Sequence, residues 1–502
     1  MSPRLGGPMV SFDATEALKI KDVLDVVDMT GPDSEPFGGG FAVLATNTWA
    51  AFMGAQAVIA EWGAAPYPTT TAEMDAVLSD TLAKGNGDNL RDDGDVGLAF
   101  ADAPRDRIVD VEYSVPYLAH ATMEPMNATA QLRDGRLDIW AGTQMPTIVR
   151  ADCAVEAGVE VTDTYVHSTY LGGGFGRRGE VDFTRFATRL AKSTNGKPVK
   201  LVWSREEDMT HDTYRPAAKS RWRARLGDDG VPVAIDATIA CPSVIGSVMG
   251  RMYPSLPMAG PDNTITHGAF DQPYTVADYR VSGIKAPLDV PIGFWRSVGN
   301  SYNGFFHESF IDECALAADM DPLEMRLKLM KDHPTAQNAL RRVAEMADWK
   351  DQSTNSNRAK GIAFTLSFGC WTAQVVEVSR NALGAISIDK VWCAADVGHA
   401  LDPDICKAQL MSAIVFGLSS CVGQEITFAD GMVEQTNFDD FDALRMTNCP
   451  AIEIELLEEA EHMAGIGEPG TPPSIPALAN AIARLTGERI RTMPLSKSVT
   501  FA

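Results

Sequence analysis

A glycine- and proline-rich stretch near the C-terminus constrains the chain most, GIGEPGTPPSIPALAN at Gly465–Asn480. It holds one carboxylate, Glu468, between a glycine and a proline, and the pattern that follows predicts a helix ending at Gly487. Apolar residues recur there at helical spacing, namely Ile475, Leu478, Ala479 and Ile482. A stiff loop of this kind can hold an acid in one place against a reacting centre. The alternative is an ordinary turn with a solvated glutamate.

Length and charge limit the class of protein. The chain of 502 residues is long enough for two or more domains with buried cores. The formal net charge of −24 argues against nucleic acid or an anionic membrane surface as the partner. The longest apolar run, near Leu410–Gly423, reads as too short and too interrupted to span a bilayer. We therefore expect a globular protein that does not cross a membrane.

The eight cysteines are scattered and contain no CxxC pair, so they indicate neither an iron–sulfur nor a zinc site. We expect free, mostly buried thiols in a reducing compartment, which favours the cytoplasm. The periplasm is the alternative if the chain is exported together with a partner subunit.

The hydrophobic pattern predicts a mixed α/β fold. Predicted strands lie at Phe41–Leu44, Val109–Tyr113, Leu137–Gly142, Pro198–Trp203, Gly361–Val378 and Ala385–Ala395. Predicted helices lie at Glu16–Val27, Thr48–Glu61, Tyr302–Ala318 and Asp404–Cys421, and Asp321-Pro322 predicts a capped helix start. The polar, glycine-rich segment Lys84–Asp95 is typical of a surface loop, and Asn355–Lys360 of a junction between domains.

A second glycine-rich stretch, Ser168–Arg178, contains GGGFGRR directly before an amphipathic helical pattern at Phe183–Ala191. A glycine loop at a helix start can present backbone N–H groups to an anion. The stretch has neither the GxGxxG spacing nor a Walker lysine, so a tight turn is the alternative.

Seven motifs in one order resemble the large, molybdenum-binding subunit of the xanthine oxidase family, of the isoquinoline 1-oxidoreductase beta type. They are HATMEPMNATA, GTQMPT, GGGFGRRGEVDF, LVWSREEDMTHDTYRPA, FWRSVGNSYNGFFHESFIDE, DVGHALDPD and GIGEPG. The resemblance runs from about Pro3 to Leu495. It implies an α+β fold with a partial hammerhead-like α/β domain at 1–95. Two elongated molybdenum-cofactor-binding domains would follow at 96–354 and 355–502, the second carrying the Glu468 loop.

The resemblance implies a molybdenum hydroxylase. Such an enzyme oxidises a carbon of an N-heteroaromatic substrate (pyridine, quinoline or nicotinate-like) with oxygen from water. Electrons leave through 2Fe–2S clusters in a partner subunit to an external acceptor, while the protein supplies position and proton transfer. The alternatives are an aldehyde dehydrogenase on the same scaffold and a non-catalytic scaffold subunit.

The resemblance also implies roles for single residues. Glu468 matches the catalytic general base. Three residues match substrate or transition-state positions: Arg215, for which a structural salt bridge is the alternative, and Trp295 and Val298, for which the alternative is core. Six residues match cofactor-binding positions, namely Gln144, Gly174, Phe175, Gly176, Arg296 and Gly467. No side chain of this chain is expected to ligate the metal.

Two departures from the family pattern matter. Purine oxidisers carry an acid directly after the glycine loop, whereas here Arg177-Arg178-Gly179 precede Glu180, which argues against purines. The MGQG-like segment that grips the pterin does not occur in this sequence. We therefore expect a heterotrimer with a separate molybdopterin-binding subunit and a small 2Fe–2S subunit. The cofactor, molybdenum–molybdopterin cytosine dinucleotide, would be shared with the former.

Overall fold

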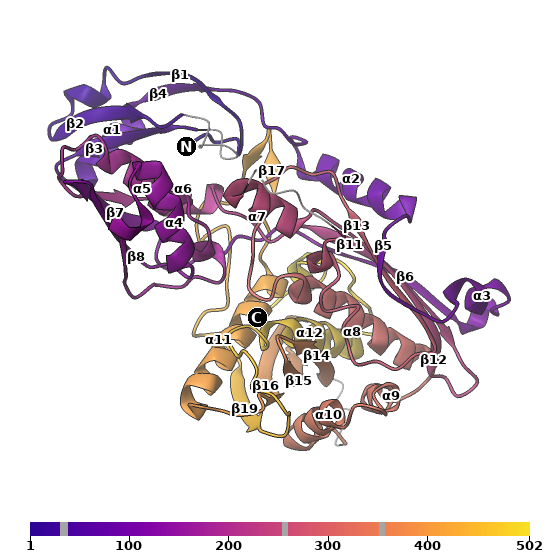
Figure 1. Ribbon diagram of the computed structural model, residues 1–502. Helices are drawn as coiled ribbons and strands as arrows, with labels where there is room; N and C mark the ends of the chain where they lie inside the picture. Colours follow the sequence, from indigo (N-terminus) through magenta and orange to yellow (C-terminus); the bar gives the residue numbers. More distant parts are fainter. Residues whose placement is uncertain (31–38, 254–259, 351–356) are drawn as a thin grey trace.

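The computed structural model describes residues 1–30, 39–253, 260–350 and 357–502. It is 33% helical and 28% strand, which confirms the mixed α+β fold class. Figure 1 shows three parts: an N-terminal unit, a small sheet with its helices beside it, and two larger sheets that carry most of the helices.

The N-terminal unit consists of two separate two-stranded antiparallel sheets and one helix. Its elements are β1 (Met9–Asp13), β4 (Ile59–Trp62), β2 (Val23–Asp28), β3 (Phe41–Ala45), the short 3₁₀ turn Ala17–Lys19 and α1 (Thr48–Ala57). The two sheets touch through the ring of Phe41, whose centroid lies 6.0 Å from that of Phe12 and 6.4 Å from that of Trp62. Arg189 of the next part donates to the carbonyl of Met29 and joins the unit to it.

A four-stranded sheet with the order β10-β7-β8-β9 follows. Its members are β7 (Asn127–Arg133), β8 (Arg136–Ala141), β9 (Thr164–Ser168) and β10 (Val199–Val202), with helices α4 (Pro146–Ala157) and α5 (Asp182–Ala191). The apolar side of α5 packs on β7 and forms a core with the sheet. The loop after β8 and the loop after β9 therefore leave this core from the same edge, because these two strands are parallel neighbours.

A five-stranded sheet with the order β5-β13-β12-β11-β6 forms the long central layer. Its strands are β5 (Asp88–Asp93), β6 (Ile108–Val115), β11 (Ala218–Leu226), β12 (Pro232–Cys241) and β13 (Asp278–Lys285). Three helices belong to this region, α2 (Thr71–Lys84), α3 (Val96–Ala101) and α7 (Val244–Met252), whereas the short α6 (Arg205–Thr210) follows β10 and lies near α5 (Figure 1). β5 and α2 contact this sheet although both precede residue 95. The domain boundaries stay a prediction.

The C-terminal part is built on the sheet β14-β15-β16-β19. Its strands are β14 (Arg358–Ser367), β15 (Cys370–Arg380), β16 (Ile386–Asp396) and β19 (Ala451–Leu457), with a small hairpin of β17 (Phe428–Ala429) and β18 (Met432–Val433). Its helices are α8 (Gly299–Ala317), α9 (Pro322–Leu329), α10 (Pro334–Met346), α11 (Pro403–Val422) and α12 (Thr471–Thr486).

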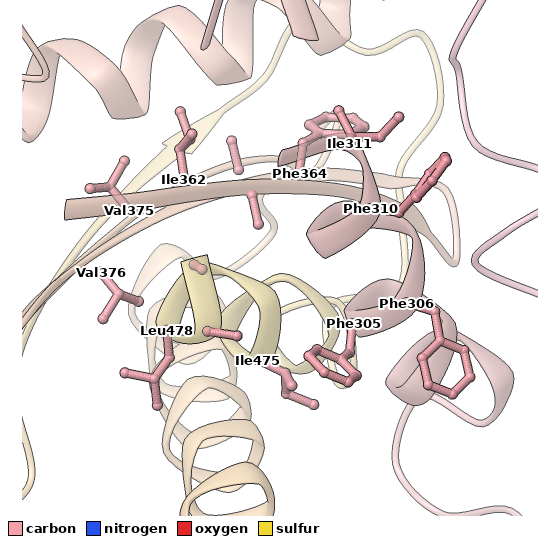
Figure 2. Packing of buried hydrophobic residues seen from close by; sticks show 14 of the residues in the cluster. Phe305, Phe306, Phe310, Ile311, Ile362, Phe364, Val375, Val376, Ile475 and Leu478 are labelled. Carbon is pink, nitrogen blue, oxygen red and sulfur yellow. The ribbon is translucent and has the colours of Figure 1, made fainter. Parts of the chain in front are cut away.

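The helix predicted after the Glu468 loop is α12, which ends at Gly487 in the left-handed conformation (φ 78°), as the sequence predicts. α12 packs on β14 and β15 on one side and on α8 and α11 on others. Figure 2 shows Ile475 and Leu478 pointing from α12 into a cluster that includes Phe305 and Val376. Glu468 therefore lies in the loop directly before a helix that is packed on three sides.

α11 is the one helix in the described residues that is long and apolar enough to cross a membrane by length and composition. The run is thus longer than the sequence pattern suggests. Its inner side is buried against α12 through Leu410, Ala413, Ile414 and Leu418. Its first two turns are largely exposed, and Ile405 and Met411 lie at the surface. α11 is therefore a core helix on one side, and its exposed N-terminal end mixes Ile405 with the charged Asp404 and Lys407.

Three local expectations from the sequence are wrong. Glu16–Val27 is not a helix, because its valines pair as strand β2 after a single 3₁₀ turn. Thr48–Glu61 divides into α1 and β4. Lys84–Asp95 contains strand β5, whose polar sequence pairs with β13 only because the sheet offers a free edge there. The junction at Asn355–Lys360 lies partly outside the described residues.

We expect Leu478→Ala to lower the free energy of unfolding by about 2–5 kcal/mol, because a fully buried side chain in the α12 core is replaced by a cavity. Leu383→Ala is the matched control, since Leu383 is 94% exposed. Urea unfolding of both variants measures the difference. Equal midpoints would show that α12 is not the packed core element described here.

Candidate active site

Four loops meet at one place in the structure. They are the loop after β8 with Gln144, the glycine loop after β9, the segment before α8 with Arg296, and the Glu468 loop before α12. Gln144 Oε1 accepts from the N–H of Gly176 at 3.1 Å, and Arg296 Nε donates to the carbonyl of Gly467 at 2.8 Å. The glycine loop and the Arg296 segment both contact the Phe416 ring, the first through Phe175 and the second through Trp295. The structure therefore brings together most of the residues predicted for a site.

Glu468 is half-buried and held in one orientation. The N–H of Ser297 donates to Glu468 Oε1 at 2.8 Å, and the Ser297 hydroxyl donates to the Glu468 carbonyl at 2.9 Å. Burial raises the pKa of Glu468, while the Ser297 N–H and the charge of Arg296 act against this, and the pKa remains above its ordinary value of 4.5. One carboxylate oxygen is fixed and the other has no hydrogen-bond partner among the described residues, so the group can accept a proton at a defined position.

The segment that holds Glu468 has an uncommon backbone. Ser297 and Val298 have φ of 75° and 46°, a conformation that costs a β-branched residue like valine steric strain. The strain is compensated locally, because Ser297 makes both bonds to Glu468 and the Ser301 hydroxyl donates to the Val298 carbonyl at 2.7 Å. Val298 therefore sits half-buried at the start of α8, beside the acid.

The glycine loop needs glycine for steric reasons. Gly176 has φ 111°, and a Cβ there would lie 1.3 Å from the carbonyl oxygen of Phe294. A Cβ on Gly174 would lie 2.6 Å from Gln144 Oε1. The loop thus passes directly against both the Gln144 side chain and the segment before Arg296. The loop is therefore packed against two other segments, which the alternative of a simple tight turn would not require.

Arg178 ties the glycine loop to the Gln144 loop. Its buried guanidinium donates to the carbonyls of Gly142 and Gly173 at 3.1 and 2.9 Å and to Glu124, and its own carbonyl accepts from the N–H of Gln144 at 2.9 Å. The sequence shows Arg178 only as a charge after the glycines. Its burial, which decides its role, comes from tertiary packing and could not be read from the motif.

A buried polar network lies behind the glycine loop. His120 places Nδ1 2.8 Å from Asp212 Oδ1, and its Nε2 donates to the Phe294 carbonyl at 3.1 Å. Arg177 pairs with both Asp212 and Asp182. Burial opposes the charge on Asp212, but His120 and Arg177 outweigh it and hold the pKa of Asp212 below its usual value. These residues lie in the HATMEP, GGGFGRRGEVDF and HDTYR motifs, but nothing in the spacing of the motifs indicates that they meet.

An aromatic stack forms the floor of the site. The ring of Phe416 on α11 lies 4.6 Å from that of Phe175 and 4.7 Å from that of Trp295. The Arg296 guanidinium lies 5.7 Å from the Phe416 ring. Trp295 is 1% exposed and its Nε1 donates to the Ala119 carbonyl, so it is part of the core beneath the site. Phe416 was not predicted, because its spacing on an apolar helix looks like that of any core residue.

Arg215 lies against Trp295, with its guanidinium carbon 5.4 Å from the ring centre. It is buried, donates to the Pro116 carbonyl at 2.8 Å, and leaves Nε without a partner. Burial lowers its pKa to about 9. Among the described residues no carboxylate pairs with Arg215, so the structural salt bridge is not found. Glu180, which lies further in sequence from the glycine loop than the acid of purine oxidisers, forms a salt bridge with Arg251 at 2.6 Å.

The donor set fits a pterin cofactor that carries a metal. The oxygen of the Gln144 amide accepts from Gly176, and its NH₂ has no hydrogen-bond partner among the described residues. The glycine loop passes directly against Gln144, and the Arg296 segment holds the acid of Glu468. Within the described residues no group of three His, Cys, Asp or Glu side chains could hold a metal ion. This fold and these donors are those of a cofactor-binding protein.

Comparison with known proteins gives the family. Two models described as molybdopterin cofactor-binding domains match residues 82–330 and 315–450. The chain is 33% identical over 398 residues to the beta subunit of isoquinoline 1-oxidoreductase from Brevundimonas diminuta, covering 78% of this chain and 50% of that protein. The chain therefore belongs to the xanthine oxidase family of molybdopterin-binding oxidoreductases.

Other relatives agree. The chain is 29% identical over 525 residues to a membrane-bound aldehyde dehydrogenase of Gluconacetobacter polyoxogenes (98% of this chain, 66% of that protein). It is 28% identical over 451 residues to a subunit of nicotinate dehydrogenase from Pseudomonas putida (84% and 37%). It thus spans between about a third and two thirds of these relatives. The fold matches quinoline 2-oxidoreductase from Pseudomonas putida 86 with a TM-score of 0.81 at 15% identity, covering 98% of this chain and 92% of that one.

We expect Gly176→Ala to lower the free energy of unfolding by more than about 3 kcal/mol, because the new Cβ meets backbone and strains φ together. Gly135→Ala is the matched control: φ is 78° and nothing lies within 4 Å, so only the cost of φ remains, about 1–2 kcal/mol. Urea unfolding compares the two. A Gly176→Ala variant no less stable than the control would contradict the close packing of the glycine loop.

Proposed function

We propose that this chain is the catalytic, molybdenum-binding part of a hydroxylase that oxidises a carbon of an N-heteroaromatic substrate. The observation that carries the proposal is Glu468: half-buried, oriented by Ser297, raised in pKa, and beside the glycine loop and Gln144. A scaffold subunit would have no need of an acid held in this way. The names of the isoquinoline and nicotinate relatives support the substrate class.

The residues of this chain divide the work. Glu468 accepts a proton at its free carboxylate oxygen, and its raised pKa makes it a better base than a solvated glutamate. Gln144 and the glycine loop hold the cofactor by hydrogen bonds, and Arg296 fixes the Glu468 loop through the Gly467 carbonyl. When bound, the molybdenum–pterin group supplies the two-electron oxidation of the substrate carbon.

Arg215 and the aromatic floor favour a substrate that is aromatic and takes up negative charge. A buried guanidinium without a carboxylate partner is costly unless an anion comes close to it. A pyridine carboxylate offers such charge, and the Arg215 guanidinium lies against Trp295, which precedes the segment that holds Glu468. The second candidate is an aldehyde dehydrogenase, because the aldehyde dehydrogenase relative matches 98% of this chain. Turnover of nicotinate against an aliphatic aldehyde separates the two.

Two features of this chain support the proposed partners: its free, scattered cysteines and the exposed start of α11. The cysteines are free and scattered, and Cys449 alone is exposed, so we propose that 2Fe–2S clusters sit in another subunit. We propose a molybdopterin cytosine dinucleotide shared with a molybdopterin-binding polypeptide that covers the exposed start of α11. The reducing cytoplasm is the compartment we propose, in keeping with free thiols.

We expect Glu468→Gln in the assembled enzyme to lower turnover by about 10²–10⁴-fold, because the proton acceptor is lost while the shape is kept. Glu461→Gln, on an exposed glutamate seven residues earlier, is the control. In the wild type, kcat/KM should rise with pH as Glu468 loses its proton, with a midpoint above 4.5 because its pKa is raised. Steady-state kinetics with nicotinate measures both. Near-normal turnover of Glu468→Gln would end the assignment.

We expect this chain by itself to retain little molybdenum, and the assembled complex to retain about one per chain. The reason is that the proposed partner polypeptide would supply the remaining contacts to the cofactor, next to the exposed start of α11. Metal analysis and sizing of the chain with and without its partner polypeptides provide the measurement. A soluble monomer holding one molybdenum per chain would contradict the shared site.

A further inference from the structure

A cavity of about 1400 Å³ lies away from the candidate active site, between the N-terminal unit and the four-stranded sheet. Figure 1 shows the N-terminal unit, in indigo, next to the elements of that sheet. α1, β3 and β10 border the cavity, together with Ala60 and Trp62 of β4 and Phe186 and Leu190 of α5. Its lining is mainly apolar, with charged groups such as Lys197 and Glu206 among it.

The cavity reaches the edges of two strands. All five residues of β3 and all four of β10 border it. Successive side chains of a strand point to opposite faces, so a space that touches every residue is not confined to one face of the strand. Among the described strands, β3 pairs only with β2 and β10 only with β7, so each has one free edge.

The hydrogen bonds of these strands show which N–H groups point into the free edge. The N–H of Trp203, the residue after β10, donates to the Met126 carbonyl next to β7. Backbone N–H groups alternate in direction along a strand, so those of Lys200 and Val202 point away from β7. Met29 donates to Gly40, and by the same alternation the N–H groups of Phe41 and Val43 point away from β2. Four backbone donors thus face outward beside one apolar space.

We propose that an extended segment from outside residues 1–502 fills this cavity and adds a β-strand to β10 and β3. The occupant is the part of the relatives' length that this chain does not cover, since the Brevundimonas diminuta relative is only half covered. Three observations carry this: the paired free edges, the apolar lining, and the two isolated two-stranded sheets, which are marginal in stability without further strands. The segment carries apolar side chains at alternate positions to meet Phe52, Trp62 and Phe186.

The docked strand would act on the candidate active site through the sheet. β10 pairs with β7, β7 with β8, and the loops after β8 and β9 carry Gln144 and the glycine loop. Extending the sheet therefore stiffens the scaffold of the cofactor donors. The identity of the partner rests on the proposed function, but the pairing of strands does not need the cofactor.

The test uses a defined probe, namely the part of the Brevundimonas diminuta protein outside its match to this chain, made as a separate polypeptide. We expect it to bind the full chain and to slow amide hydrogen exchange at Lys200, Val202, Phe41 and Val43 by about tenfold or more. Lys200→Pro removes one outward donor without touching the ladder to β7, and should weaken binding by about tenfold. Lys200→Ala keeps the N–H and should bind as the wild type does.

Thermal unfolding of both variants establishes that they fold. Failure of the probe to bind, a complex without protection at the four amides, or equal binding by Lys200→Pro and wild type would each overturn the proposal. The outcome is separate from that of the proposed function. A complex with protected amides but no hydroxylase activity would contradict the proposed function and support the added strand. Activity without protection of the amides would contradict the added strand and support the proposed function.

Discussion

The site depends on one contact between two distant segments, the pairing of the Arg296–Ser297 turn with the Glu468 loop. Residues 171 positions apart are joined by four hydrogen bonds, two from the Arg296 side chain to the Gly467 carbonyl and two from Ser297 to the carboxylate and the carbonyl of Glu468. Because the first segment begins α8 and the second begins α12, the packing of these two helices fixes the acid. A carboxylate whose position is fixed by the segments before two helices does not have to be oriented before it accepts a proton, which is what a positioned acid–base group requires.

Buried charge supports the glycine loop in the same way. Arg177, Arg178, His120 and Asp212 are all nearly inaccessible, and each makes bonds to the loop, to the segment before Arg296 or to one another. Removing one partner of such a network leaves a buried charge unpaired, which is far more costly than the net gain from forming it. The glycines therefore move little even though their backbone alone would be free. Rigidity here comes from charge behind the loop, not from the loop sequence.

The sequence predicted the helices and the acid better than the strands. α12, its end at Gly487, the Asp321 cap and α11 follow from local signals that act within one or two turns. β5 and β2 did not follow, because a strand's stability lies in its neighbours and the sequence of β5 is polar. At the site, motif order placed Glu468, Gln144 and Arg296 together. Phe416 and Asp212 could not be found, since their roles exist only through contacts made in the folded chain.

α11 links the site to the surface that the chain leaves open. Its Phe416 lies under Phe175 and Trp295, and Arg296 bonds to Ser412 and to the carbonyl of Gln409 one to two turns earlier. The turns before these are exposed and mixed in polarity, with Ile405 next to Asp404 and near Lys407. A displacement of α11 would therefore reach Arg296, and through Arg296 the Gly467 carbonyl next to the acid. The position of α11 and the geometry of the Glu468 loop are linked by this one side chain, because α11 is itself packed closely against α12.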